Sequence, residues 1–322
     1  MRRRDLLLAA TLAAPAFIAA RSARAADEFP AKDIAFIIPY SAGGGFDSYV
    51  RAIAPVMERY LPHKVNVLPT NVPAGGGARG TNQLYRAKPD GYTIAIFNIP
   101  GMFVMQQSGD SGYDLTKVSW LGSIGRDHYG IGVGANSPIK SIADLQALAA
   151  TRPVKFTSTG PEATAYAATL IACELLGIKP QLIGGYKGSN DYVVAAIRGD
   201  GDAVVTALPL LRRMQAGGEL RIIAAFEEHG TVAGAADATM LGQPELAEIV
   251  LERLIGAPPG LPADIRAILA DALAKSVADP EITAWAKKSD SELIWATPDQ
   301  AAHILADQAA FFAKWKKYLV PT

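Results

Sequence analysis

Short runs of aliphatic and β-branched residues alternate with amphipathic stretches along this chain, and that alternation constrains its fold more than any other feature. Residues 34–38 predict a strand, and residues 46–61 follow as a helix with Tyr49, Ile53 and Met57 on one face. The same pattern predicts further strands at residues 65–68, 92–97, 119–124, 131–133, 154–157, 181–183, 203–206, 220–225 and 249–255. Alternating strands and helices predict open, mostly parallel sheets covered by helices on both faces.

The predicted helices lie between these strands and in the tail. Ser141 is a typical cap for one of them, and three tail helices are expected to start after Pro262, at Pro280 and at Pro298. The remaining helices are predicted at residues 78–86, 163–176, 190–198 and 208–215. The lone Cys173 lies in an apolar helical stretch and is expected in the core, whereas residues 101–117 are predicted to be irregular.

The number of strands predicts two lobes. About ten strands would be many for one open twisted sheet, and a chain of 322 residues has the length at which single cores divide. We expect a hinge near residues 125–132 and a return crossing near residues 226–242, with the tail completing the first lobe. The first lobe would then contain residues 26–127 and 243–322, and the second lobe residues 128–242.

The first 25 residues have the order of a secretory signal peptide. Arg2, Arg3 and Arg4 precede an apolar run over residues 6–20, and residues 23–25 form a small-x-small cleavage site. The run is shorter than the roughly 20 residues of a membrane-spanning helix, which disfavours a retained anchor. Arg3-Arg4-Asp5-Leu6-Leu7 fits the twin-arginine export pattern. We therefore predict export to the periplasm and cleavage after residue 25.

Cleavage would change the charge balance of the chain. The 31 basic and 31 acidic residues would become 26 and 30, because the leader holds five Arg and one Asp. No basic stripe remains that would indicate nucleic acid or an anionic membrane as a partner. Attraction of an anionic ligand would have to come from local geometry.

Four loops after predicted strands are rich in glycine or hydroxyl residues. They cover residues 39–47, 73–77, 157–164 and 186–191. Glycine lets the backbone approach a ligand closely, and the helix that follows presents free N–H groups and a positive dipole end. In open α/β sheets ligands bind at the carboxyl ends of the strands, where all four loops fall.

Each loop alone also has a purely structural interpretation. Glycine turns often only reverse the chain, and Ser, Thr or Asp before a helix often only caps it. Asp47 in particular is expected to cap or brace its loop, because a carboxylate repels an anion. The recurrence of this chemistry in four loops favours a ligand site, and two loops from each lobe could close over a carboxylate.

Enzyme patterns are weak by comparison. Residues 75–80 match G-x-G-x-x-G formally, but they follow the second strand, and Asn98 stands where a dinucleotide site needs an acid. Residues 109–112 resemble a serine-protease loop without an oriented base or acid. There is no phosphate-loop lysine and no Cys/His metal spacing. We predict no catalysis, no cofactor and no metal; a nucleotide-dependent enzyme is the competing class.

Five segments carry a resemblance to the tripartite tricarboxylate transporter receptor family, also called Bug proteins. They occur in the family's order along the whole mature chain, which makes the set specific although each motif is short. The segments are residues 34–47, 71–77, 88–93, 186–188 and 217–221.

The resemblance implies a type II periplasmic binding protein with a ligand cleft between two α/β lobes. It implies that the first two loops hold one carboxylate through backbone N–H groups and bridging waters, and that hydroxyls face them from the second lobe. The first set is Ser41, Ala42, Gly43, Gly44, Gly75 and Gly76, and the hydroxyl set is Thr157, Ser158, Thr159, Thr164 and Ser189. The implied partners are a small organic carboxylate and membrane transporter subunits, and we expect a monomer.

Some positions depart from the family pattern. Tyr166 stands where a His is frequent, Thr206 where an acid is common, and Phe46 where small residues prevail. Tyr40, Phe46, Tyr166 and Tyr186 could form an aromatic wall, which would suit a ligand with an apolar or aromatic body. A receptor for a neutral or zwitterionic solute remains an alternative, because none of the loops guarantees an anion.

Overall fold

The computed structural model describes residues 28–107, 109, 111–160 and 163–319. The predicted signal peptide and its cleavage site lie outside the described residues, as do residues 161 and 162 of the third loop. Among the described residues, no helix is both long enough and apolar enough to cross a membrane.

The first lobe is built on three parallel strands. β1 (Ile34–Ile38) lies between β2 (Val67–Asn71) and β3 (Thr93–Ile99). Its helices and short 3-10 turns are α2 (Gly45–Met57), η1 (Glu58–Tyr60), η2 (Gly75–Gly77), α3 (Ala78–Tyr85), α4 (Gly101–Gln107) and η3 (Leu115–Lys117). Tyr49, Ile53 and Met57 of α2 are buried, as their spacing predicted.

The second lobe repeats this plan. β5 (Val154–Thr157) lies between the parallel strands β6 (Pro180–Ile183) and β7 (Ala203–Ala207). A fourth strand, β8 (Leu220–Ala225), pairs with none of these three. The helices are α5 (Ile142–Ala149), α6 (Thr164–Leu175), α7 (Ser189–Arg198) and α8 (Leu208–Ala216), and the turn η4 (Pro244–Glu248) follows. The Ser141 hydroxyl caps α5 by accepting from the Asp144 N–H, and Cys173 is buried in the core; both predictions are confirmed.

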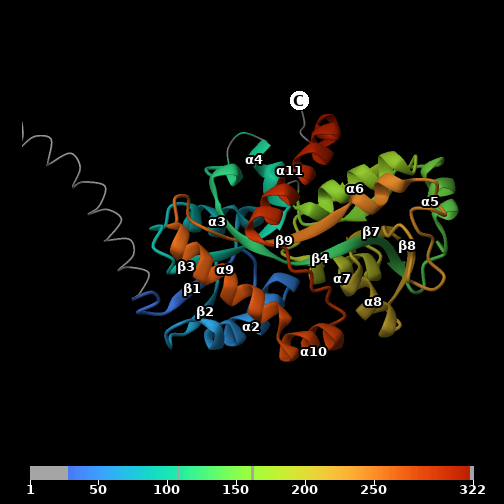
Figure 1. The fold of residues 1–322 in the computed structure, drawn as a ribbon. Coiled ribbons are helices and arrows are strands. Elements are labelled where there is room, and N and C mark those ends of the chain that lie inside the picture. Colours follow the sequence, from blue (N-terminus) through green and yellow to red (C-terminus); the bar gives the residue numbers. More distant parts are fainter. Residues whose placement is uncertain (1–27, 108, 110, 161–162, 320–322) are drawn as a thin grey trace, which may run out of the picture.

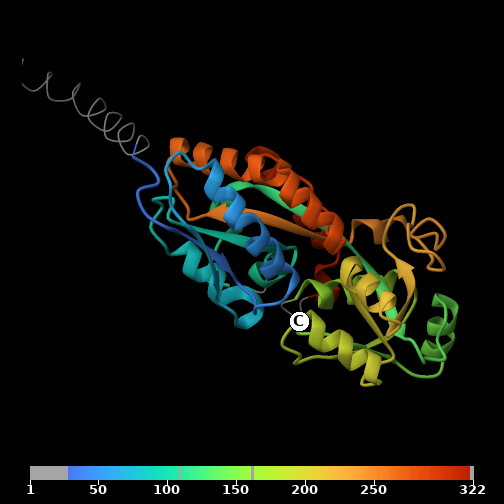
Figure 2. The ribbon, with the colours of Figure 1, turned by 90° about the horizontal axis from the view of Figure 1, so that it is seen from below.

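Two long antiparallel strands join the lobes. β4 (Ser119–Gly134) pairs with β9 (Val250–Ala257) in the first lobe and with β7 and β8 in the second. The continuous order is β2-β1-β3-β9-β4-β7-β5-β6, so the sheet is mixed: parallel in its outer strands and antiparallel at the junction. Figures 1 and 2 show β4 running from one lobe into the other beside β9.

The structure corrects the prediction at this junction. Residues 119–124 and 131–133 were predicted as separate strands, but they belong to the single strand β4. The region predicted as a return crossing packs against the second lobe, where Ala236 bridges to Ala224, and the chain crosses back only at β9. The domain boundaries at 127/128 and 242/243 stay a prediction.

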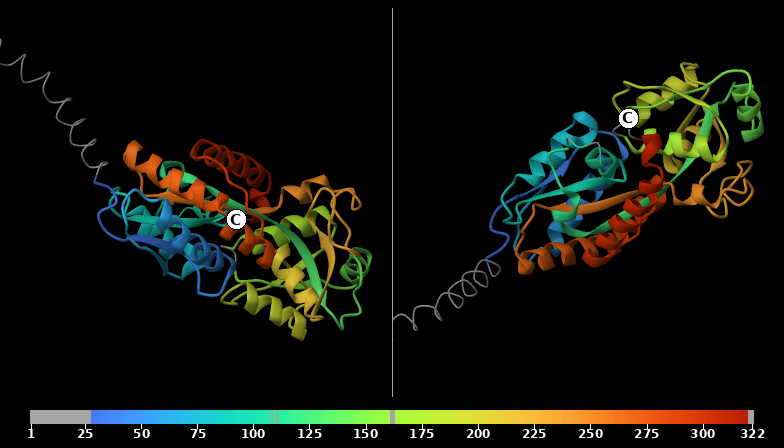
Figure 3. Two further views of the ribbon diagram at one scale, coloured as in Figure 1. Left: turned by 60° about the horizontal axis from the view of Figure 1, so that its bottom comes forward. Right: turned by 90° about the horizontal axis from the view of Figure 1, so that it is seen from above.

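The tail crosses the junction as well. Its helices are α9 (Ala263–Ala278), α10 (Pro280–Ser289), α11 (Pro298–Lys314) and α12 (Lys316–Leu319), and the three proline-marked starts are confirmed. Ala301 and Leu305 of α11 pack in the first lobe, whereas Phe311 and Phe312 pack in the core of the second. Figure 3 shows the last helices lying across the junction.

The prediction that residues 101–117 are irregular is wrong in part. α4 occupies its start, and it buries Met102 in the first lobe and Val104 against the second-lobe core. The segment therefore contributes buried side chains to both lobes. β2 also begins two residues later than predicted, at Val67.

Candidate functional site

The first loop lies between β1 and α2, and Asp47 braces it. The carboxylate of Asp47 accepts from the Gly43 N–H, from Arg51 Nε and from Asn71 Nδ2, each at 2.9 Å. Burial would raise the pKa of this carboxyl group, but the bonds from Arg51, Gly43 and Asn71 outweigh burial and lower it. Asp47 therefore stays charged and holds the loop, whose residues Ser41–Gly43 are exposed.

The second loop is held against the first. Ala74 and the glycines at 75–77 all have positive φ, a conformation that glycine, but not alanine, adopts without strain. The Tyr40 hydroxyl donates to the Gly76 carbonyl at 3.1 Å, and a Cβ on Gly77 would lie 3.0 Å from that hydroxyl oxygen. Asn71 also donates to the Tyr40 carbonyl. The two glycine-rich loops thus form one support at the carboxyl ends of β1 and β2.

An aromatic pair lies beside this support. The rings of Tyr40 and Phe46 stack with centroids 4.7 Å apart. Asn98, at the carboxyl end of β3, donates from Nδ2 to the Tyr40 hydroxyl at 2.9 Å. Tyr40 is therefore fixed between the second loop and the central sheet.

The second lobe presents hydroxyl groups at the ends of β5 and β7. Thr157 Oγ1 donates to the Tyr192 carbonyl, and Thr206 Oγ1 lies 2.7 Å from the Tyr192 hydroxyl. Burial raises the pKa of Tyr192 to about 12, so its phenol stays neutral. Ser158 Oγ and Thr159 Oγ1 are buried and have no hydrogen-bond partner in the part of the chain that the structure describes.

The two lobes touch at the first turn of α6. Thr164 Oγ1 donates to Asn98 Oδ1 at 2.6 Å and accepts from the Gly101 N–H at 2.9 Å. A Cβ on Gly101 would lie 2.7 Å from Thr164 Oγ1, so this approach requires glycine. The end of β3 and the loop after β5 are thereby brought together.

The other predicted residues form no side-chain hydrogen bond between the lobes in the described part of the chain. Tyr166 and Ser189 are half-buried in the first turns of α6 and α7. The Tyr186 hydroxyl donates to Asp200 within the second lobe. Gly44 and Gly75 lie in the two glycine loops, as expected from the sequence.

Two residues of this region were missed by the sequence analysis. Asn98 was considered only as an argument against a dinucleotide site, although a polar residue that ends a buried strand could have indicated its role. Arg253 lies in β9, where every residue is buried, and its own exposed fraction is 3 %. A charged residue inside an apolar strand is rare unless it is paired, and that signal was available.

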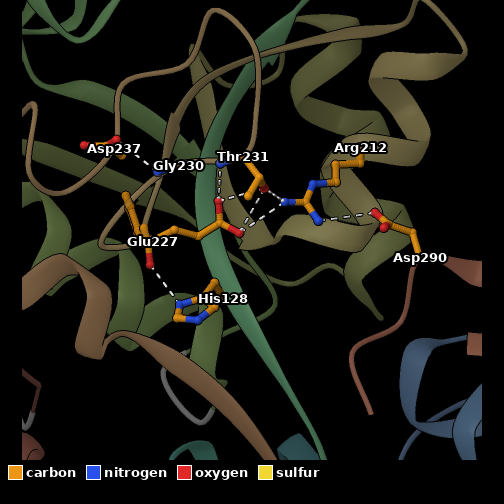
Figure 4. Close-up of polar contacts among 8 residues, drawn as sticks. His128, Arg212, Glu227, Gly230, Thr231, Asp237 and Asp290 are labelled. Carbon is orange, nitrogen blue, oxygen red and sulfur yellow. Dashed lines mark hydrogen bonds and ion pairs between the residues drawn. The ribbon is translucent and has the colours of Figure 1, made fainter. Parts of the chain in front are cut away.

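A charged network borders the junction on the second lobe. Arg212 of α8 donates to Thr231 Oγ1 at 2.6 Å and to Glu227 Oε1 at 3.1 Å, and its other nitrogen lies 3.5 Å from Asp290 Oδ2 (Figure 4). Asp290 follows α10, so this last contact joins the two lobes. Because both side chains are partly exposed, the pair adds at most about 1 kcal/mol to the contact between the lobes.

The described residues also contain a shallow surface hollow, but it lies elsewhere. It is lined by Asp33, Glu58, Arg59, Lys64, Val65 and Asn66. Asp33 and Asn66 precede β1 and β2, at the amino ends of these strands. Ligands of open α/β sheets bind at the opposite ends, so the hollow is not part of the candidate site. No cluster of His, Cys, Asp and Glu among the described residues could hold a metal ion.

A family model described as the tripartite tricarboxylate transporter family receptor matches residues 50–319. Protein BugT of Bordetella pertussis is 27% identical over 297 residues, 88% of each chain. A UPF0065 protein of Cupriavidus necator is 31% identical over 166 residues, and this match spans half of each chain.

Solved structures resemble the fold over most of its length. The periplasmic binding protein BugD has a TM-score of 0.78 at 21% identity, and the match covers 89% of this chain and 98% of BugD. A protein of R. palustris solved with adipate scores 0.81 at 21% identity, over 90% of this chain and 98% of its own. MatC of Rhodopseudomonas palustris, solved with malate, scores 0.79 at 18% identity, over 90% of this chain and all of its own.

Proposed function

Since this chain belongs to the tripartite tricarboxylate transporter receptor family, whose members are periplasmic solute-binding proteins, we propose that it captures a small organic carboxylate between its two lobes. The proposal assigns one carboxylate group to the backbone N–H groups of the two glycine loops. It assigns the facing contacts to the hydroxyl groups of the second lobe.

One observation carries this proposal. The Ser158 hydroxyl is fully buried, yet it has no partner in the described chain. Buried polar groups in proteins are almost always hydrogen-bonded. Ser158 directly follows β5 and opens the loop that leads to Thr164, which contacts Asn98 of the first lobe. In this proposal, a ligand carboxylate held between the lobes supplies the acceptor that this hydroxyl lacks.

The proposed contacts follow the predicted set of residues. They are Tyr40, Ser41, Ala42, Gly43, Gly44, Phe46, Gly75, Gly76, Thr157, Ser158, Thr159, Thr164, Tyr166, Ser189 and Thr206. The Gly43 N–H already donates to Asp47, so Gly43 contributes close backbone approach and its neighbours contribute the free N–H groups, while Asp47 braces the loop. The stacked pair of Tyr40 and Phe46 supports a ligand with an apolar or aromatic body.

A thermal-shift screen tests the proposal. The protein is unfolded and refolded first, so that a retained native ligand does not mask the response. A ligand at a hundredfold excess over its dissociation constant adds about 2.7 kcal/mol to stability, which raises Tm by a few degrees for a chain of this size. The panel contains malate, adipate, citrate, aromatic acids, amino acids, sugars and dinucleotides.

The panel separates the competing functions. Stabilisation by carboxylates is the expected result. Hits confined to sugars would favour a receptor for neutral solutes, and hits confined to zwitterionic amino acids would favour the zwitterion alternative. A response to dinucleotides alone would favour an enzyme. A response to citrate alone would contradict the aromatic wall but not the carboxylate assignment.

Export and delivery complete the proposed function. The segment Arg3-Arg4-Asp5-Leu6-Leu7 supports twin-arginine export, and membership of a transporter receptor family supports delivery to membrane subunits. Sequencing of the periplasmic protein should find Ala26 as the first residue. Normal export of the variant Arg3→Lys, Arg4→Lys would contradict the twin-arginine route.

A further inference from the structure

Arg253 emerges from the central sheet beside the candidate site. In the antiparallel register of β9 and β3, Arg253 is paired with Asn98. Directly paired residues project to the same face of a sheet, and the Asn98 side chain there holds both Tyr40 and Thr164. The Arg253 side chain therefore leaves the sheet on the face where the two lobes meet.

Its guanidinium group lies directly beneath the first loop. A Cβ on Gly45, the exposed first residue of α2, would be 3.3 Å from Arg253 Nη2. The guanidinium carbon is 5.3 Å from the ring centroid of Phe46 and 4.2 Å from that of Tyr49. The cation is therefore close to the backbone of the loop and to these two rings.

The hydrogen bonds of Arg253 are incomplete. Arg253 Nη2 donates to Asp127 Oδ2, but Arg253 Nε and Nη1 have no partner among the described residues, and neither has Asp127 Oδ1. Burial opposes the charge of Arg253, whereas Asp127 favours it, and the pKa of Arg253 lies above its ordinary value as a result. The guanidinium is thus charged, buried and only partly satisfied.

Its position is unfavourable for the protein alone. The N-terminus of a helix carries a partial positive charge, which favours anions and disfavours cations. A cation beneath the first turn of α2 is therefore repelled by the helix dipole. If the ion pair between β4 and β9 served the fold alone, this position would add no stability to it. An anion bound on the loop would be attracted by the helix and by Arg253 together.

We propose that Arg253 is a specificity-determining residue of the carboxylate site, which attracts the bound carboxylate from beneath the first loop, and that Asp127 limits this attraction. The inference rests on the proposed function and deepens it: the site would prefer anionic solutes over neutral solutes of the same shape. Arg253 acts here as a positioning residue, through its field and through the loop above it.

Two variants of the pair test the inference because they change the charge in opposite directions. Asp127→Asn keeps the shape and leaves Arg253 unopposed, so it should tighten adipate binding about tenfold, the effect of one added charge a few ångströms away. The double variant Arg253→Met, Asp127→Asn removes both charges and should weaken adipate binding at least about tenfold. Replacing a buried ion pair by neutral residues is often tolerated, so the double variant should fold.

The neighbouring ion pair provides a matched control. Arg126 and Glu252 form an ion pair between the same two strands, and each directly precedes a member of the Asp127–Arg253 pair. Arg126→Gln, Glu252→Gln should therefore reproduce any purely structural effect on the junction without changing adipate affinity.

Calorimetric titration of adipate, with its neutral diamide as a second probe, gives the decisive comparison. Opposite changes in the Asp127→Asn and double variants, seen with adipate and not with the diamide, support the inference. If Asp127→Asn unfolds more easily, adipate should raise its Tm more than that of the wild type. Equal adipate affinities in the wild type, the double variant and the control would overturn the role of Arg253. A wild-type chain that no carboxylate stabilises would instead overturn the proposed function itself.

Discussion

The two sides of the proposed site use different chemistry. In the first lobe the loop after β1 offers main-chain N–H groups, and Asp47 already fixes its shape through three partners. In the second lobe the loop after β5 offers the buried hydroxyls of Ser158 and Thr159, which have no partners in the described chain. The bonds that brace the first loop form without a ligand, whereas Ser158 and Thr159 would gain hydrogen bonds from a bound molecule. We expect the first side to decide whether a carboxylate binds and the second to decide how firmly the lobes hold it.

The largest expected effect on the first side is the loss of carboxylate affinity in Gly44→Val. The φ of Gly44 is −84°, and an added Cβ would meet nothing closer than the Ser41 carbonyl at 3.7 Å. The fold should tolerate the change, but the side chain would block the approach to the N–H groups. Carboxylate affinity should fall at least about a hundredfold, with little change in Tm.

A control and a contrast accompany this variant. Gly217→Val, at the end of α8 with φ of −75°, should leave affinity unchanged. Gly76→Val differs because its φ is +59°, which costs a branched residue about 1–2 kcal/mol. Calorimetric titration with thermal melting separates lost binding from lost stability, and normal affinity in folded Gly44→Val would refute the loop assignment.

The second side is tested by Ser158→Ala. Removing a hydroxyl that lacks a partner should not lower the free energy of unfolding, and it should raise it by up to about 1 kcal/mol. Affinity should nevertheless fall about tenfold, because a hydrogen bond to a charged ligand is lost.

Ser276 offers a matched buried hydroxyl. Its Oγ donates to the Ala272 carbonyl at 2.6 Å in α9. Ser276→Ala should lower stability by about 1 kcal/mol and leave affinity unchanged. The opposite result, with stability lost in Ser158→Ala and affinity retained, would show that the Ser158 hydroxyl serves the fold.

The contact between the two sides is tested by Thr164→Val. This variant keeps the shape but removes the bonds to Asn98 and to the Gly101 N–H. We expect a more open population in solution scattering without ligand and a loss of affinity of about threefold to tenfold. Thr169→Val in the same helix is the control, because its hydroxyl bonds within α6 to Ala165. If Thr164→Val and Thr169→Val give the same scattering profile as each other, both without ligand and with it, closure does not depend on this contact.

The smallest expected effect concerns the acid stability of the first side. The folded pKa of Asp47 is lowered, so its contribution to stability is present above the unfolded pKa of about 4 and is lost as pH falls through the folded value. Asp47→Asn should therefore lower stability at neutral pH and flatten its decline below about pH 4. Parallel curves of unfolding free energy for the wild type and the variant would contradict the bracing role.

Much of the fold could be predicted because its strands and helices have clear local signals. β1 and the proline-marked helices α9, α10 and α11 start where their sequences indicate. The single strand β4 was not predicted, because its pairing partners lie far away in the sequence. α4 was missed for a related reason: its short apolar run is helical through its packing between the lobes.

The candidate site was predictable only where composition marks it. Glycine and hydroxyl clusters predicted four candidate loops, and the structure places these loops at the carboxyl ends of strands. Asn98 and Arg253 are single residues whose neighbours come from other elements, and their pairing depends on the register of β3 with β9. Local patterns carry no information about such a register, so the polar contacts beneath the first loop needed the three-dimensional structure.

The shared strand β4 has a consequence for how this molecule unfolds. Its first half is hydrogen-bonded into one lobe and its second half into the other, and α11 also packs in both cores. If the sheet of either lobe unfolds, one half of β4 loses its hydrogen-bonded partners. The other half, which belongs to the sheet of the other lobe, is then less well held. A molecule with two lobes should therefore behave as one cooperative unit in calorimetry, and a chain cut within β4 should leave two fragments that depend on each other to fold.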